Sequence, residues 1–266
     1  MTFYETLTAA VREFEARGYH SPEQLIEWAD KIRTAALSTL TPESEIRSGL
    51  TAALNAIYTR QVTGGAMLKI HSGVSRFTLD QVKPQLRAEL ERRIMSSAGL
   101  IKLNRAAAIE GTLQRFSGWA TSIPVGGSRA VDKTDVKSDI RKSMASLPFN
   151  ERRVIIDQSH KFVSSLNNIL AVDGGAIAGR WSSRWRRPGY NFREDHKERD
   201  QHVYLIRDNW AQAKGLVKAG PDGYTDQITM PAEEVYCSCT YVYLYNLRDM
   251  PDNMLTKAGK AALNRS

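Results

Sequence analysis

Two segments hold the side chains of this sequence that are best suited to bind a metal ion. The first is the charged run from Arg193 to Asp200, which contains His196, and the second is the short motif Cys237-Ser238-Cys239. Imidazole nitrogen and thiolate sulfur are ligands that zinc prefers, and small loop-rich modules often depend on such an ion to fold. The two segments together therefore predict a zinc site, which would be structural rather than catalytic.

The spacing of the two cysteines leaves this prediction open. Residues one apart on an extended segment point to opposite faces, so both thiolates reach one ion only where the backbone bends. Three clear ligands also leave a fourth position to fill. The candidates for it are Asp200, which we take as the tentative ligand, His202 and Glu234. The alternative is that the cysteines are small buried apolar residues and the histidine lies at the surface.

A cluster of arginines and tryptophans precedes the histidine segment. Arg180, Arg184, Arg186 and Arg187 lie close in sequence to Trp181 and Trp185. Guanidinium groups and indole rings suit contact with phosphates and bases, or insertion into a partner surface. Tryptophans at this spacing are equally expected as core residues with exposed arginines beside them. We assign the four arginines and Trp185 as candidate residues for binding nucleic acid or a partner protein.

The elements around these residues predict an α+β protein. Helical periodicity gives three helices in the first 60 residues, two more over residues 78–121, and two between residues 133 and 170. Residues 202–206 and 235–245 have the pattern of strands and predict a short antiparallel sheet closed by the His/Cys motif. We expect a helical region 1–123, a Gly-rich linker 124–132, an α+β module 133–248 and a polar tail 249–266.

Length and composition exclude several classes of protein. The chain has 266 residues, 42% hydrophobic and 25% charged, so it can bury a core without disulfides. No apolar run approaches the length of a membrane span, and the start lacks the pattern of a signal peptide. We therefore expect a reduced, intracellular and soluble protein. The net charge of +8 is spread over both halves of the chain and permits contact with nucleic acid without requiring it.

The second half of the chain resembles a known family. The run Asn191 to Gln201, then Trp210, then Pro231, then Tyr236-Cys237-Ser238-Cys239, is similar to the C-terminal motif of phage Mu F-like minor head proteins. These are also called phage head-morphogenesis proteins. The resemblance covers residues 150–246, and it implies that Arg193, Trp210 and Pro231 are structural residues of the motif.

The sequence also departs from that family pattern. Arg193 stands where cysteine-rich relatives have their first cysteine, and Glu234 stands where they have a histidine. Gln201 replaces a glycine, and Ser238 replaces an arginine between the two cysteines. Only His196, Cys237 and Cys239 remain of the implied ligand set. An interaction of Arg193 with a carboxylate could replace part of the role of the metal.

The resemblance implies a protein without enzymatic activity that acts in head morphogenesis as a minor capsid component. Its partners would be the phage portal and major capsid proteins, with double-stranded DNA as a further candidate, and it would be oligomeric in the virion. The same reading places it in the head or neck of the virion, in the host cytoplasm during assembly, and away from membranes. Two alternatives remain open, a His-metal nuclease of the HNH type that uses His196, and a plain DNA-binding protein.

Overall fold

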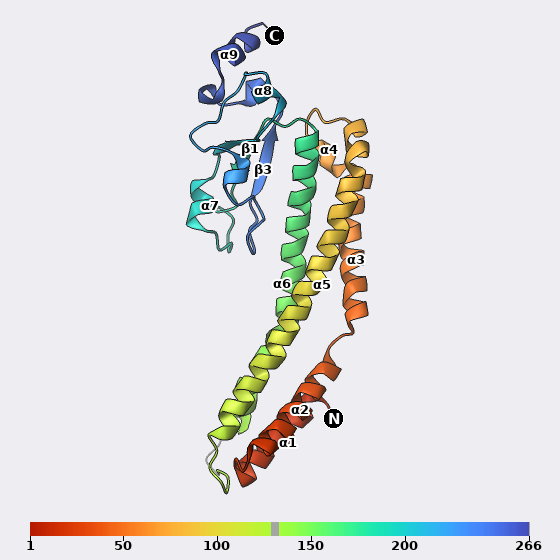
Figure 1. Cartoon of the computed structure of the whole chain (residues 1–266), viewed down its shortest axis with the longest axis vertical. Coiled ribbons are helices and arrows are strands. Elements are labelled where there is room, and N and C mark those ends of the chain that lie inside the picture. The colour runs from red at the N-terminus through yellow and green to blue at the C-terminus, as the bar shows by residue number, and fades with distance from the viewer. Residues whose placement is uncertain (129–132, 266) are drawn as a thin grey trace. The chain divides into compact units, whose positions relative to one another are not determined.

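The computed structural model describes residues 1–128 and 133–265, and most of them are helical (Figure 1). The α-helices are α1 (Phe3–Arg17), α2 (Pro22–Thr39), α3 (Glu43–Tyr58), α4 (Ala66–Ile70), α5 (Arg76–Thr121), α6 (Lys133–Asp173), α7 (Glu194–Glu198), α8 (Trp210–Ala213) and α9 (Lys257–Leu263). The strands are β1 (Ala178–Ser182), β2 (Val203–Leu205) and β3 (Thr240–Leu244). A π-helical turn, η1 (Thr59–Thr63), and the 3-10 turns η2 (Thr225–Gln227), η3 (Leu247–Asp249) and η4 (Asp252–Met254) complete the list. The expected α+β class is confirmed.

Two compact units divide the chain, and they are interleaved along it. Unit 1 contains residues 1–50 and 96–155, and unit 2 contains residues 51–95 and 156–266. This differs from the expected succession of regions 1–123 and 133–248, because the long helices α5 and α6 each pass through both units. The linker expected at 124–132 is described only as far as Ser128. The expected tail 249–266 contains α9, and its last residue lies outside the described part.

Unit 1 is built from α1, α2, the start of α3 and the adjoining parts of α5 and α6. Its core is a cluster of side chains from four of these helices: Leu7, Ala10, Val11, Phe14, Ile32, Ala36, Ile109, Leu113, Phe116, Ala120 and Ile140. Phe14 packs edge-on against Phe116, with their ring centroids 5.5 Å apart. The described part of the Gly-rich segment is bonded to the end of α1, since the amide of Gly126 donates to the carbonyl of Arg17 at 2.8 Å.

Helices α5 and α6 are single long helices, which corrects two expectations. The sequence predicted two helices over 78–121 and two over 133–170, yet α5 has 46 residues and α6 has 41. Each contains a proline, Pro84 or Pro148, which removes one backbone hydrogen bond from the helix. In α5 the apolar row continues past Pro84 on the buried face, with Leu79 and Leu86 both fully buried. Burial of that row stabilises a continuous helix despite the local preference for a break.

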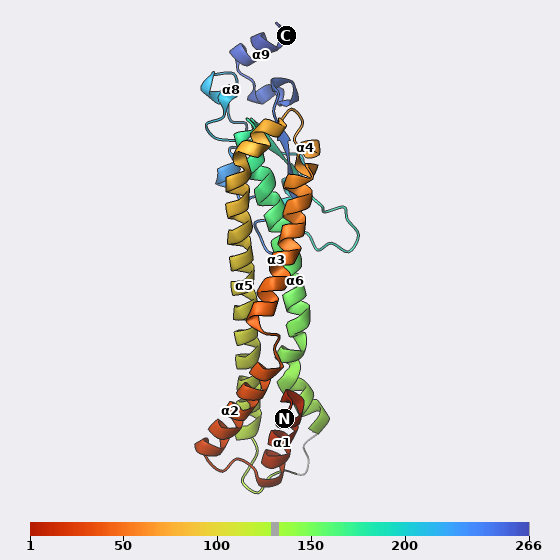
Figure 2. The ribbon, with the colours of Figure 1, turned by 90° about the vertical axis from the view of Figure 1, so that its right-hand side faces the viewer.

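The helical part of unit 2 packs segments of α3, η1, α4, α5 and α6 around one core. Within this unit, the segments of α5 and α6 run side by side in opposite directions, with the end of α3 beside them (Figure 2). The buried side chains are Leu54, Val62, Met67, Leu79, Val82, Leu86, Leu90, Ile94, Phe162, Leu166 and Leu170. His71 follows α4 and is 1% exposed. Its Nδ1 lies 2.6 Å from the hydroxyl of Tyr245, and its Nε2 lies 3.0 Å from the amide oxygen of Asn167.

The remainder of unit 2 is a small antiparallel sheet with long loops. Its strand order is β2-β1-β3, so β1 lies in the middle and pairs with both neighbours. The sequence predicted β2 and β3, and it missed β1, where small, charged and aromatic residues follow one another without an alternating pattern. In β1 the absence of a side chain at Gly179 lets the ring of Tyr241 lie over the strand, since a Cβ there would meet that ring at 2.9 Å. Among the described residues, no helix combines the length and the apolar character needed to cross a lipid bilayer.

Candidate metal centre

The loop before β3 bends so that both cysteine sulfurs lie on the same side. Tyr236, directly before Cys237, has a φ of 61°, and Ala232 has a φ of 66°. Residues other than glycine rarely adopt this left-handed backbone conformation, so the surrounding contacts must hold the loop in it. The amide of Ala232 donates to Cys237 Sγ at 3.3 Å. The bend that two cysteines with this spacing require is therefore present.

His196 lies on α7 and meets both cysteines. Its Nδ1 is 3.5 Å from Cys237 Sγ and 3.7 Å from Cys239 Sγ. All three side chains are 1% exposed, and the ring of His196 packs edge-on against Trp181 at 5.2 Å between centroids. Side chains that are distant in the sequence thus form one compact and fully buried group.

The distances in this group suit a tetrahedral ion. Zinc binds nitrogen at about 2.0–2.1 Å and sulfur at about 2.3 Å, which separates N and S ligands on a tetrahedron by about 3.6 Å. The separations from Nδ1 to the two sulfurs match that value. One imidazole and two thiols are three ligands of the types that zinc prefers, and they leave the fourth position of a tetrahedral site without a ligand among the described residues of the group. His196, Cys237 and Cys239 therefore could hold a metal ion.

The other nitrogen of His196 faces two carboxylates. Its Nε2 is 3.6 Å from Glu234 Oε1 and 3.8 Å from Asp195 Oδ2, and it has no hydrogen-bond partner among the described residues. Histidines that bind a metal through one nitrogen commonly direct the other N–H to a carboxylate. A small movement of Glu234 would complete that arrangement, so this side of the imidazole also suits a metal-binding role.

Arg193 and Glu234, the two positions that depart from the family pattern, form an ion pair. Arg193 Nε lies 2.8 Å from Glu234 Oε2, and Nη2 of the same side chain donates to the carbonyl of Val235 at 3.0 Å. The pair connects the segment before α7 to the segment before the cysteines. The expected interaction of Arg193 with a carboxylate is therefore present, and its partner is Glu234.

The two thiols have opposite pKa shifts because they share a hydrogen bond. Donation from the Cys237 thiol lowers the pKa of Cys239, and contacts with Ser183 and His196 lower it further. The same hydrogen bond and burial raise the pKa of Cys237. The pair therefore supports one thiolate in the absence of an ion, and a bound cation would favour ionisation of the second.

The structure does not bring Asp200 into this group. Its Oδ1 accepts a hydrogen bond from the amide of Ser183 at 2.8 Å, and its Oδ2 accepts one from Trp185 Nε1 at 3.1 Å. These bonds lower the pKa of Asp200 although burial opposes the shift. The tentative assignment of Asp200 as a fourth ligand is thus not supported by its position, and its carboxylate instead orders the arginine-rich loop. His202 pairs with Asp222 at 2.8 Å and also lies outside the group.

The basic cluster divides into a buried and an exposed part. Trp181 is fully buried, which confirms its reading as a core residue, and Arg180 on β1 is half-buried. The other three arginines, Arg184, Arg186 and Arg187, are exposed in the loop after β1. Trp185 is half-buried, with the guanidinium of Arg186 4.7 Å and the amine of Lys197 5.5 Å from its ring centroid. The exposed arginines and Trp185 form a cationic surface held by Asp200.

Trp210 and Pro231 contribute to the packing of the module. Trp210 Nε1 donates to the carbonyl of Gly175 at 3.0 Å, and the carbonyl of Pro231 accepts from the hydroxyl of Ser164 on α6 at 2.7 Å. Sequence reasoning gave no role to Asp157 on α6, which accepts from the amide of Tyr236 at 2.6 Å. It also missed Tyr190, whose hydroxyl accepts from the amide of Ser238 at 2.9 Å. Neither contact has a signal in the spacing of the residues, because the partners are distant in sequence.

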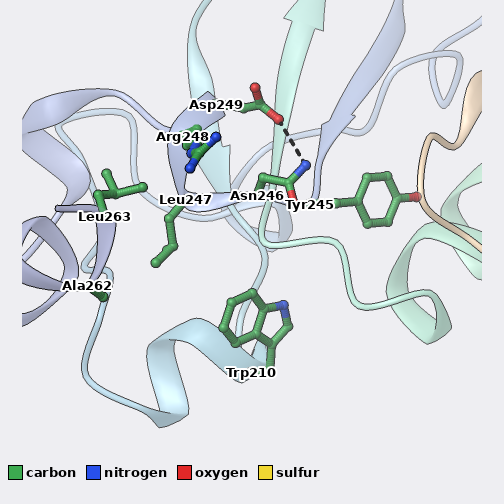
Figure 3. Close-up of a pocket in the computed structure, with 8 residues that line it drawn as sticks. All are labelled: Trp210, Tyr245, Asn246, Leu247, Arg248, Asp249, Ala262 and Leu263. Atoms are coloured by element: carbon green, nitrogen blue, oxygen red, sulfur yellow. Dashed lines mark hydrogen bonds between the residues drawn. The ribbon is translucent and has the colours of Figure 1, made fainter. Parts of the chain in front are cut away.

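One surface pocket of this unit adjoins Trp210 at the end of β3 (Figure 3). Its volume is about 580 Å³, and it is lined by Trp210, Tyr245, Asn246, Leu247, Arg248, Asp249, Ala262 and Leu263. Several of its polar groups already have partners, because Tyr245 contacts His71, and the Asn246 amide approaches Asp249 at 3.5 Å. It contains no group of convergent side chains comparable to the one around His196.

No model of a known protein family matches the chain, and no match to a curated protein or to a solved structure was found. The resemblance to the head-morphogenesis family accordingly rests on the motif residues alone.

Proposed function

We propose that this chain is a non-enzymatic structural protein of phage head morphogenesis, a minor component that associates with the portal and major capsid proteins in the virion. The observation that supports the proposal is the convergence of the motif residues. His196 meets Cys237 and Cys239 in one buried group, and the substituted positions Arg193 and Glu234 pair beside it. His196, Cys237 and Cys239 belong to the motif on which the resemblance to the family depends, and Arg193 and Glu234 are positions where the sequence departs from the cysteine-rich relatives.

Within this proposal, the His/Cys group binds a structural zinc ion. It joins His196 on α7 to Cys237 and Cys239 in the segment before β3. An ion bound there supplies a crosslink between loops, and the chain's own residues orient the ligands. The amide of Ala232 directs Cys237, and Trp181 packs against the ring of His196. Each of the three ligand side chains is only 1% exposed, and this burial favours a structural role over a catalytic one.

The exposed arginines Arg184, Arg186 and Arg187, with Trp185, are the proposed contact with packaged double-stranded DNA or with an acidic surface of a partner. Such a surface binds phosphates through charge, without reading sequence. Their loop is anchored by Asp200, which holds both Ser183 and Trp185. The three arginines therefore lie on a loop whose conformation these hydrogen bonds fix.

The burial of His196 also weighs against the nuclease alternative. A general base must reach the attacking water, and His196 is 1% exposed behind Trp181. Asp195, the neighbouring carboxylate, pairs with Arg199 at 2.8 Å. We expect plasmid DNA incubated with the protein and Mg²⁺ or Mn²⁺ to stay intact for hours. Cleavage that is lost in His196→Ala would favour the nuclease instead.

Co-assembly tests the proposal directly. The chain is co-expressed with the portal and major capsid proteins of the same phage or prophage genome, and particles are separated by sedimentation. We expect the chain to sediment with portal-containing particles. The double variant Cys237→Ser/Cys239→Ser should be incorporated less, and Ser238→Ala, which keeps both thiols, should match the wild type. If the chain stays in the soluble fraction and particles form equally well without it, the proposal is wrong.

A further inference from the structure

One face of α6 directs polar side chains at the segment that carries the cysteines. Asp157, Ser164 and Asn168 have the spacing i, i+7 and i+11, which places them on the same face of the helix. Asn168 accepts a hydrogen bond from the hydroxyl of Tyr243 on β3 at 3.2 Å. The other two side chains bind residues 231–239, here called the cysteine loop. This face of α6 therefore contacts both β3 and the loop before it.

The cysteine loop contains two residues whose backbone is strained, and each adjoins one of these contacts. Ala232 has a φ of 66° and Tyr236 a φ of 61°. The hydroxyl of Ser164 donates to the carbonyl of Pro231, directly before Ala232, at 2.7 Å. Asp157 Oδ1 accepts from the amide of Tyr236 itself at 2.6 Å. Residues other than glycine keep such a conformation only where their surroundings hold it, and here α6 supplies the contacts.

The same two strained residues determine where the thiols point. The amide of Ala232 donates to Cys237 Sγ at 3.3 Å, and Tyr236 directly precedes Cys237. With this bend, the sulfurs of Cys237 and Cys239 lie 3.5 Å and 3.7 Å from Nδ1 of His196. On an extended segment the two cysteines would point to opposite faces. The contacts from α6 therefore act on the geometry of the His/Cys group through the backbone of the loop.

Asp157 is itself held firmly in place. The residue is 6% exposed, and its Oδ2 lies 3.2 Å from Lys161 Nζ and 3.1 Å from Gln158 Nε2. Its Oδ1 faces the amide of Tyr236. A charged acceptor makes a shorter and stronger hydrogen bond than a neutral one. A fixed carboxylate on a long helix thus defines the position of the residue before Cys237.

We propose that Asp157 is a positioning residue of the His/Cys metal centre: by holding the bend at Tyr236, it sets the affinity of the centre for zinc. This inference rests on the zinc site proposed above. Residues that support metal ligands typically change the affinity by about 10–100-fold when they are removed. Asp157 acts one step further out, on the backbone that carries the ligands. Because such coupling is reciprocal, a bound ion also strengthens the contact between the loop and α6.

Metal titrations of the full-length chain test this role. Zinc affinity is measured by competition with a chromophoric chelator, and cobalt(II) reports the geometry through its thiolate charge-transfer and visible absorption. Asp157→Ala should bind zinc about 10–100-fold more weakly and give weaker tetrahedral cobalt bands. Asp157→Asn keeps an oxygen that accepts from the amide of Tyr236, so it should bind within about threefold of the wild type. Circular dichroism shows that each variant is folded before titration.

A rescue variant separates positioning from general stability. Glycine adopts a positive φ without strain, so Tyr236→Gly should make the bend independent of α6. In that background Asp157→Ala should weaken zinc binding less than about threefold, as a double-mutant cycle measures. Asn168→Ala is the matched control, because it removes the contact of the same helix face with β3. It should lower the melting temperature and leave the zinc affinity unchanged.

Hydrogen exchange on the wild type gives a measurement that needs no variant. Zinc should slow amide exchange in the segment of α6 around Asp157 as well as in the cysteine loop, since the two are coupled. Protection confined to the loop would contradict the proposal.

The remaining outcomes distinguish this inference from the zinc site on which it rests. A wild-type chain that binds neither zinc nor cobalt would refute the site and the inference together. A wild-type chain that binds zinc, with Asp157→Ala binding as tightly and giving the same cobalt spectrum, would refute only the role of Asp157. The same follows if Tyr236→Gly rescues nothing, or if Asn168→Ala weakens zinc binding as much as Asp157→Ala does.

Discussion

Removal of zinc should lower the thermal stability of unit 2 by a measurable amount. The three ligands are buried and no disulfide is formed by the two cysteines, so an ion would be the crosslink between α7 and the segment before β3. An ion that binds only the folded state stabilises it by about 2.7 kcal/mol when its free concentration is 100 times its dissociation constant. For a unit of this size, each kcal/mol shifts the melting temperature by about 2–4 °C. The expected loss is therefore about 5–10 °C.

Differential scanning calorimetry measures this shift on protein treated with a chelator and then returned to zinc. The double variant Cys237→Ser/Cys239→Ser should melt at the same temperature with and without zinc. Ser238→Ala is the matched control, because it changes the residue between the cysteines and keeps both thiols. It should retain the full response.

Metal content gives a second measurement of the same site. Purified wild-type protein should contain about one zinc per chain, because the three ligands of the proposed site are preformed in the fold. Two results together would refute the reasoning from the His196 geometry. They are a zinc content below about half an equivalent per chain after growth with zinc, and a melting temperature that does not respond to added zinc.

Three further predictions concern the core, the pH dependence and the basic surface. Trp181→Ala should lower the free energy of unfolding by about 3–5 kcal/mol in denaturant titrations, because it empties the fully buried centre of the sheet; a loss below about 1 kcal/mol would contradict that packing. Burial lowers the pKa of His71 from its ordinary value of 6.5, so the folded state binds fewer protons than the unfolded state and stability should fall as the pH drops below about 6.5. In denaturant titrations at several pH values, His71→Gln should reduce the dependence of the free energy of unfolding on pH. An unchanged dependence would mean that other titratable groups cause it. Charge reversal of Arg184, Arg186 and Arg187 to Glu should weaken retention of the protein on DNA. It should also reduce the slope of the logarithm of the DNA-binding constant against the logarithm of the salt concentration by up to about 2.7. Unchanged retention would exclude this surface as the DNA contact.

The sequence by itself determined the elements whose signals are local. The periodicity of apolar residues located α1, α2 and α3, and the alternation of tyrosines located β3. Ligand chemistry identified His196 and the two cysteines as a candidate site, because imidazole and thiol side chains are rare in this chain and have few alternative roles together. These predictions needed only the residues and their near neighbours.

Only the tertiary structure decided which distant residues meet. The sequence predicted two helices over residues 78–121, whereas burial of the apolar row, which includes Leu86, Ile94 and Ile101, keeps α5 continuous. The position of Asp200 next to Ser183 and Trp185 excludes it from the His/Cys group. Likewise, the bend at Tyr236 is held by contacts from α6 and not by its own sequence. Each of these outcomes depends on packing between segments far apart in the chain, where the free energy of burial exceeds local preferences.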